Sequence, residues 1–294
     1  MSEHTYIADN AQMTAYLQRL KDRDVREIAL DVEGEFNLHV YGERFCLLQL
    51  YDGHEEVVVD PFATSANLIR DLLENRNLLK ITYDSSSDRV LLAKTHRIVM
   101  NSILDLRPAV EILGFDRSDL KSVLDDSLGV HEPGNKKRFQ QYDWTRRPID
   151  DDAIEYALQD VRYLFPLKDH LLRRLFETGS LEAYILENTK RQDRPPETDR
   201  KPGIFRSGRH RRLTRDQQRE FKRIYEIRDR HARELDLPPN TVVANDDLFA
   251  LVTGEITVAA VRGNRRVPEQ RLQAIKRELE APEQGPVPPA SAGR

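Results

Sequence analysis

The chain has 294 residues, of which 39% are hydrophobic and 33% are charged, and its formal net charge is −4. This composition supplies enough apolar side chains for a folded core and excludes a chain that is disordered throughout. No apolar run approaches the roughly 20 residues that a membrane-spanning helix needs, and the start of the chain lacks the pattern of a signal peptide. With a single cysteine and therefore no intrachain disulfide, we expect a soluble, cytoplasmic protein that contacts no membrane.

The first part of the chain alternates between strand-like and helix-like segments. The predicted strands are residues 27–32, 45–50, 56–60, 78–82 and 98–100. The predicted helices between them are residues 64–75 and 88–96, and later segments are mainly helical. Residues 34–42 are the expected hairpin connection between the first two strands. Adjacent strands followed by this alternation predict an α/β fold with a mixed sheet covered by helices.

The character of the sequence changes near residue 189. Residues 189–223 contain 13 Lys or Arg and 5 Asp or Glu, and their prolines and glycines are typical of a linker. Helical spacing returns from Arg215 and continues in further short segments. The predicted domain organisation is a first domain over residues 1–188, a basic linker over 189–210, a small all-α domain over 211–280 and a disordered tail over 281–294.

Two carboxylates, Asp31 and Glu33, end the first predicted strand. Because side chains alternate along a strand, both project from the same face. Like charges at this spacing repel, so the pair is an unfavourable strand end unless a cation lies between them. A solvated strand end is the alternative, and the pair by itself does not decide between the two in a chain with 50 acidic residues.

Three further residues are candidates for the same site. Tyr156 and Asp160 stand four residues apart in a predicted helix, so the phenol and the carboxylate share one helix face. Asp88 begins a predicted helix, where a carboxylate also stabilises the helix start as a cap. Four carboxylates repel a phosphodiester unless divalent cations neutralise them, and hard oxygen ligands suit Mg²⁺ or Mn²⁺. Two such ions about 3.5–4 Å apart activate water and stabilise a departing 3′ oxygen.

These motifs and their order resemble the ribonuclease D group of 3′–5′ exonucleases, of the Asp-Glu-Asp-Asp type with a tyrosine. The matching segments are residues 28–33, 46–50, 80–88, 120–124, 137–148 and 156–160. The resemblance spans roughly residues 5–180 and implies a ribonuclease H-like mixed sheet flanked by helices. It also implies an enzyme that hydrolyses phosphodiester bonds from the 3′ end of RNA, in structured-RNA or tRNA 3′ processing. Its cofactors would be two divalent metal ions, Mg²⁺ or Mn²⁺.

The resemblance also implies a role for each site residue. Asp31, Glu33 and Asp160 would hold one metal ion. Asp31 would bridge to the second ion, which Asp88 would support. Tyr156 would orient the attacking water. The residues expected to contact the substrate are Lys137, Gln140, Trp144 and Arg147, which combine charge with aromatic surface before the third motif.

Several alternatives stay open at this point. Trp144 is equally well explained as a core anchor, and Arg147 as the lead-in to a helix. The family has a histidine where Tyr83 stands, and Asp84 is a rival to Asp88 as the acid of the second motif. Glu35 follows Glu33 closely enough to lie near the metals.

The second domain, residues 211–280, resembles the helicase-and-RNase-D C-terminal (HRDC) domain, which implies a role in holding nucleic acid. The basic residues before it would add phosphate contacts that weaken with salt. The expected partner is nucleic acid, in the form of single-stranded RNA 3′ ends. A 3′–5′ exonuclease on DNA and a non-catalytic nucleic-acid-binding protein are the alternative functions, because no motif distinguishes RNA from DNA.

Overall fold

The computed structural model describes residues 4–131, 138–139 and 141–281. The chain divides into two compact units. The first comprises Met1–Glu35 and Glu43–Thr198, and the second comprises Phe36–Gly42 and Asp199–Arg294. In the described part of the chain, no helix is both long and apolar enough to span a membrane.

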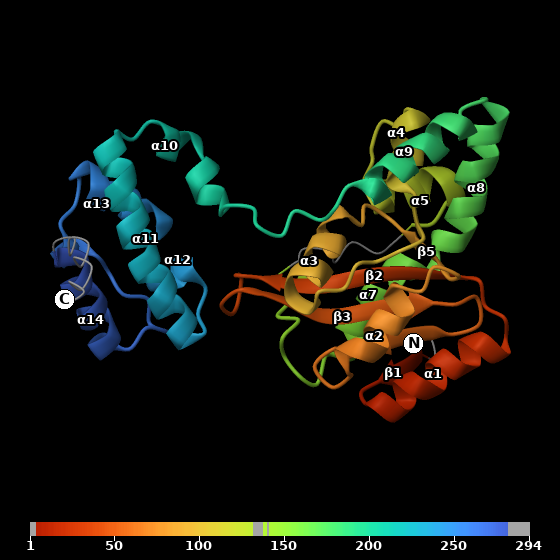
Figure 1. The fold of residues 1–294 in the computed structure, drawn as a ribbon, viewed down its shortest axis with the longest axis horizontal. Helices are drawn as coiled ribbons and strands as arrows, with labels where there is room; N and C mark the ends of the chain where they lie inside the picture. Colours follow the sequence, from red (N-terminus) through yellow and green to blue (C-terminus); the bar gives the residue numbers. More distant parts are fainter. Residues whose placement is uncertain (1–3, 132–137, 140, 282–294) are drawn as a thin grey trace, which may run out of the picture. The chain divides into compact units, whose positions relative to one another are not determined.

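The first unit is built on a six-stranded sheet with the strand order β1-β4-β3-β2-β5-β6 (Figure 1). The strands are β1 (His4–Ile7), β2 (Glu27–Phe36), β3 (Glu43–Tyr51), β4 (Glu56–Val59), β5 (Leu79–Thr82) and β6 (Ile103–Asp105). β4 pairs antiparallel with β3 and parallel with β1, while β5 pairs parallel with both β2 and β6. The predicted mixed sheet is therefore confirmed.

Helices cover both faces of this sheet. One layer consists of α1 (Asn10–Asp22), α2 (Ala66–Leu73) and α3 (Ser86–His96). The other consists of α4 (Arg107–Ile112), α5 (Leu120–Leu128), α7 (Asp151–Arg162), α8 (Leu164–Glu177) and α9 (Leu181–Asp193). Leu92 of α3 packs in one buried cluster with Leu30 of β2, and Ala157 of α7 packs in the other with Ala29. Successive β2 residues thus point into opposite cores, as expected for a central strand.

The second unit is helical around a core of its own. Its helices are α10 (Gly208–Arg211), α11 (Arg215–Leu235), α12 (Pro239–Val242), α13 (Asn245–Thr253) and α14 (Glu269–Glu280). Phe221 of α11 packs with Phe249 of α13 and Ile275 of α14. A capping box between Thr214 and Gln217 starts α11. This cap explains why the helix begins at Arg215, where the sequence predicts helical spacing to return.

Several predicted boundaries are wrong. β2 continues to Phe36, so Asp31 and Glu33 lie within the strand and not at its end. Residues 98–100 form no strand, and the last strand of the sheet is β6. β1 and α1 are two further elements that are not among the predicted ones.

The boundary of the first domain also differs from the predicted one. The predicted linker begins inside α9, which runs to Asp193. Residues 189–193 include Lys, Arg and Gln, which favour a helix, so their positive charge does not mark a linker. The helix is also anchored to β6, because Asn188 bonds to Asp105 and Gln192 accepts from the N–H of Ile103. The predicted disordered tail lies outside the described residues from position 282 onward.

Candidate active site

Two carboxylates of the site stand in the middle of β2. Leu30 and Val32 point into the core beneath α1 to α3, whereas Ala29 points into the core beneath α7. By the alternation of a strand, Asp31 and Glu33 share the face of Ala29. Both side chains are half-buried. The strand therefore directs both carboxylates toward the helical layer that contains α7.

The third carboxylate, Asp160, comes from α7. This helix has two acids in its first turn, where they oppose the helix macrodipole, and it buries Ala157, Leu158 and Val161. Oxygen atoms of Asp31, Glu33 and Asp160 all lie within 4.8 Å of one another. Three hard oxygen donors from a strand and a helix suit a divalent cation of the Mg²⁺ or Ca²⁺ type.

Asp88, in the first turn of α3, approaches this cluster but is not one of the three carboxylates that lie within 4.8 Å of one another. β5 runs parallel to β2 with Ile81 opposite Ala29, so the carboxyl end of β5, where the chain turns into α3, lies beside the middle of β2. Asp88 is half-buried, and its charge is one cause of the raised pKa of both Asp31 and Glu33. This electrostatic effect indicates that the Asp88 carboxylate lies near the other two.

Electrostatics penalise the ionised form of this cluster. Burial, followed by the charge of Asp88, raises the pKa of Asp31. Burial, followed by the charges of Asp31 and Asp160, raises the pKa of Glu33 well above its usual range. The pKa of Asp88 is raised by burial and then by the charge of Asp105. Desolvation and like charges both favour protonation, and a bound cation reverses both effects. The donor set and its electrostatics therefore fit a divalent metal ion.

Tyr156 lies one helical turn before Asp160 on α7. Its ring stacks on Phe139, with ring centroids 4.9 Å apart and an interplanar angle of 22°. Phe139 is 7% exposed and belongs to the core. Offset stacking on a buried ring restricts how far the phenol can swing. The hydroxyl of Tyr156 is thus held on the helix face that carries Asp160.

The structure corrects the predicted substrate-contacting role of Trp144. This side chain is 5% exposed, and its ring lies 4.8 Å from that of Tyr142 in the core. The alternative of a core anchor describes it. Lys137 and Gln140 lie outside the described residues.

The predicted substrate contact of Arg147 is also corrected. Its guanidinium donates to both carboxylate oxygens of Asp60, at 2.6 and 2.8 Å. It further donates to the carbonyls of Cys46, Trp144 and Arg146 at 2.7, 2.8 and 2.8 Å. A guanidinium has five N–H groups, and these bonds use all five. Arg147 therefore cross-links the fold and has no donor left for a phosphate.

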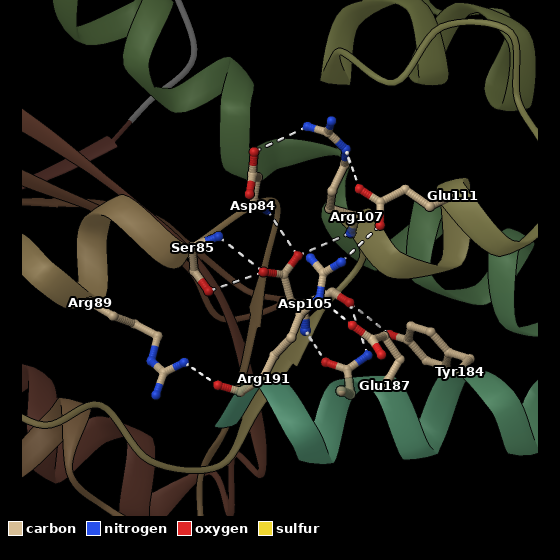
Figure 2. Close-up of polar contacts among 10 residues, drawn as sticks. Asp84, Ser85, Arg89, Asp105, Arg107, Glu111, Tyr184, Glu187 and Arg191 are labelled. Atoms are coloured by element: carbon tan, nitrogen blue, oxygen red, sulfur yellow. Dashed lines mark hydrogen bonds and ion pairs between the residues drawn. The ribbon is translucent and has the colours of Figure 1, made fainter. Parts of the chain in front are cut away.

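The two residues that depart from the family pattern, Tyr83 and Asp84, have partners of their own. Tyr83 donates to the carbonyl of Ser118 at 2.7 Å. Asp84 accepts from Arg107 at 3.0 Å, and Arg107 also pairs with Glu111 (Figure 2). Since Asp84 is engaged in this ion pair, Asp88 is the better candidate for the acid of the second motif. Glu35 lies two residues after Glu33 on β2 and is 2% exposed.

Asp105 is a residue of this region that the sequence analysis missed. It ends β6 and is 5% exposed, and its carboxylate binds the turn that precedes α3 (Figure 2). The signal in the sequence was an acid directly after the apolar pair at positions 103 and 104. It was hidden because the strand was predicted at residues 98–100.

Residues 4–176 match the sequence profile of a family described as 3′-5′ exonuclease. The chain belongs to this 3′–5′ exonuclease family. Ribonuclease D of Xanthomonas oryzae is 26% identical over 247 residues, which cover 82% of this chain and 65% of that protein. The chain spans between half and about two thirds of the length of the first curated relatives that it matches.

Solved structures share the fold. The catalytic core of RRP6 from Trypanosoma brucei matches with a TM-score of 0.78 and 20% identity, covering 95% of this chain and 79% of that one. Escherichia coli RNase D, described as an exoribonuclease involved in structured RNA processing, matches with a TM-score of 0.71 and 22% identity, covering 97% and 77%. The predicted fold class, a mixed α/β sheet flanked by helices and followed by helices, is confirmed.

Proposed function

We propose that this member of the 3′–5′ exonuclease family is a divalent-metal-dependent exoribonuclease that hydrolyses RNA stepwise from its 3′ end. The observation that carries the proposal is the close approach of Asp31, Glu33 and Asp160, whose oxygen atoms lie within 4.8 Å of one another. The similarity to relatives named Ribonuclease D supports RNA as the substrate. The physiological substrate class would be structured RNA or tRNA precursors with a single-stranded 3′ end.

The carboxylates divide the work of holding two Mg²⁺ or Mn²⁺ ions. Asp31, Glu33 and Asp160 would hold one ion, and Asp31 would also reach the second, which Asp88 supports. Such a pair of ions lowers the pKa of water and stabilises the departing 3′ oxygen in an in-line displacement. In this proposal β2 and α7 supply the three carboxylates that lie within 4.8 Å of one another, and α3 supplies Asp88 beside them.

Tyr156 orients the attacking water in this proposal. A phenol has an ordinary pKa of about 10 and keeps its proton at neutral pH, so Tyr156 acts by hydrogen bonding and not by removing a proton. The stack on Phe139 holds the ring while the water is oriented. A water molecule that is already oriented loses less entropy on the way to the transition state.

The helical unit would hold the body of the RNA as an HRDC-like domain. Exposed arginines gather in and around α10 and at the start of α11. They are Arg206, Arg209, Arg211, Arg212, Arg215 and Arg219. Contacts of such side chains with phosphates weaken as salt rises, because binding releases counterions.

One assay tests the proposed activity. End-labelled single-stranded RNA and DNA of the same sequence are incubated with Mg²⁺, Mn²⁺ or EDTA, with the Asp31→Asn variant as the inactive control. We expect a stepwise ladder from the 3′ end of RNA with either metal and none with EDTA. A ladder on DNA alone would indicate a DNA exonuclease. The absence of a ladder with any metal would indicate a non-catalytic binding protein.

A further inference from the structure

The carboxylate of Asp105 binds the turn that connects β5 to α3. Asp105 pairs with Thr82 at the parallel ends of β6 and β5. Its Oδ1 accepts from the backbone N–H groups of Asp84 at 2.9 Å and Arg107 at 3.0 Å. Its Oδ2 accepts from the backbone N–H and the hydroxyl of Ser85 at 3.0 and 3.2 Å (Figure 2). Four donors around one buried carboxylate leave the group fully used within the protein.

These bonds fix the start of α3 from outside the helix. The carbonyl of Ser85 accepts from the N–H of Arg89 at 3.0 Å, which is the first turn of the helix. Ser85 is the N-cap residue, yet its side chain makes no capping bond, because the hydroxyl donates to Asp105. Asp84 before it has a φ of 59°, a left-handed conformation that is unfavourable for a residue with a side chain. The turn therefore depends on the acceptor that Asp105 provides.

Asp105 is itself held on both sides of its backbone. Asn188 of α9 accepts from the N–H of Asp105 at 3.0 Å and donates to its carbonyl at 3.1 Å. The hydroxyl of Tyr184 donates to the same carbonyl at 3.0 Å. Both partners are buried. The carboxylate thus projects from a fixed point and can transmit that rigidity to the turn.

We propose that Asp105 is a positioning residue for Asp88. By fixing the turn at Asp84 and Ser85, it sets where the first turn of α3 presents Asp88 to the other carboxylates. The inference rests on the proposed function, because it assigns a role within the same metal-dependent site. Asp105 acts through the turn and is not itself a proposed metal ligand, since each of its carboxylate oxygens already accepts two hydrogen bonds.

The test compares two isosteric substitutions in the full chain. Asp105→Asn replaces one carboxylate oxygen with an NH₂ group, which cannot accept the hydrogen bonds that this oxygen accepts. Asp60→Asn is the matched control, because Asp60 is also 5% exposed and its carboxylate also accepts four hydrogen bonds. These bonds come from Tyr6, Phe62 and, twice, Arg147, and none of the four involves α3. Both variants are expected to melt at a lower temperature than the wild type.

The first measurement needs neither metal nor RNA. Amide hydrogen exchange in EDTA is followed in peptides that cover residues 83–92. We expect Asp105→Asn to exchange faster there, whereas Asp60→Asn keeps the wild-type exchange in these peptides. Equal protection in wild type and Asp105→Asn would show that the turn does not depend on Asp105.

The second measurement is the Mn²⁺ concentration that gives half of the metal-induced rise in melting temperature, with Asp88→Asn as the reference. Asp105→Asn should need about 10-fold more Mn²⁺, in the direction of Asp88→Asn, as is usual when a residue behind a metal ligand is changed. Asp60→Asn should keep the wild-type concentration despite its lower stability. The inference would be overturned if Asp105→Asn needed the same Mn²⁺ concentration as the wild type, or if Asp60→Asn needed as much Mn²⁺ as Asp105→Asn.

The outcomes separate this inference from the proposed function. If the wild-type chain binds Mn²⁺ but leaves RNA intact, the proposed activity is refuted. The Mn²⁺ concentrations for half of the rise in melting temperature would still test the role of Asp105. A wild-type chain that binds no Mn²⁺ would refute both. If Asp105→Asn does not fold, Ser85→Ala replaces it, since it removes one of the four hydrogen bonds. A smaller shift in the same direction is then expected, and no shift would count against the inference.

Discussion

The carboxylates of this site are held in place in two different ways. Asp31 and Glu33 stand on β2, a central strand with β3 on one side and β5 on the other. Asp88 stands on the first turn of a helix, after a turn whose N–H groups bind a side chain from another strand. Backbone pairing alone fixes the strand pair, whereas the helix-borne acid needs a partner 17 residues further along the chain. Because Asp31 is proposed to reach both metal ions and Asp88 to support only one, replacing Asp31 should be more harmful than replacing Asp88.

The largest expected effect comes from the strand. Asp31→Asn removes the charge of a carboxylate that is proposed to reach both metal ions, so we expect RNA cleavage to fall on the order of 10³-fold, as for the loss of a preorganised electrostatic group. Cleavage rates with saturating Mn²⁺ measure this. Stability in EDTA should not fall, because the variant also relieves like-charge repulsion. Near-normal activity in a folded Asp31→Asn chain would show that Asp31 does not belong to the active site.

The next effect is expected from the interior of α7. Tyr156→Phe keeps the ring stacked on Phe139 but removes the hydroxyl that would orient water. We expect kcat to fall about 10²-fold, as for the loss of one preorganised hydrogen-bonding group, while the affinity for RNA stays the same. Single-turnover cleavage and a binding titration separate the two quantities. A change confined to affinity would assign Tyr156 to substrate binding instead.

Asp88→Asn sharpens the comparison between strand and helix. If Asp88 supports its metal ion through water, activity should drop roughly 10–100-fold and should partly return as Mn²⁺ is raised. Asp31→Asn should show no such return. Metal titrations of both variants against the same RNA give the result. Identical, unrecoverable losses would indicate that strand and helix carboxylates contribute equally.

The smallest expected effect is on stability without metal. The folded pKa values, about 8 for Asp31 and about 7 for Asp88, lie above those of unfolded carboxylates, so the folded state binds more protons. The resulting stabilisation is complete below the unfolded pKa, near 4, and is lost as pH rises through the raised values. In EDTA we expect the melting temperature to fall by a few degrees between about pH 5 and pH 8. Mn²⁺ should reduce the fall, and a rise over this range would contradict it.

The sequence alone predicts the parts of the site that follow local periodicity. Asp31 and Glu33 are two residues apart on a strand, and Tyr156 and Asp160 are four apart on a helix, so each pair shares a face whatever surrounds it. The mixed sheet was predictable for the same reason, since strands and helices alternate with clear patterns. The joining of these pairs into one cluster came from the family resemblance and from the chemistry of metal binding.

The rest depends on contacts between distant parts of the chain. The sequence predicts that Arg147 contacts the substrate, because its partner Asp60 lies 87 positions earlier and no local pattern links the two residues. Asp105 matters because β5 and β6 run parallel with their ends in register, which no local pattern encodes. The start of the linker differs because residues 189–193 continue α9, and the side chain of Gln192 accepts a hydrogen bond from the N–H of Ile103 in β6.

The contacts of Arg89, the neighbour of Asp88, show how far along the chain the first unit extends. Its guanidinium donates to the carbonyl of Arg191 at 2.6 Å (Figure 2). It also donates to the carbonyls of Gln192 and Arg194, each at 3.0 Å, and all three acceptors lie beyond the predicted boundary at residue 188. A fragment that stops at residue 188 would keep every proposed metal ligand but would leave this arginine facing water. The shortest fragment that retains the acceptors of Arg89 ends after Arg194. Residues 191–194, which the sequence assigns to the linker, thus support the helix that carries Asp88.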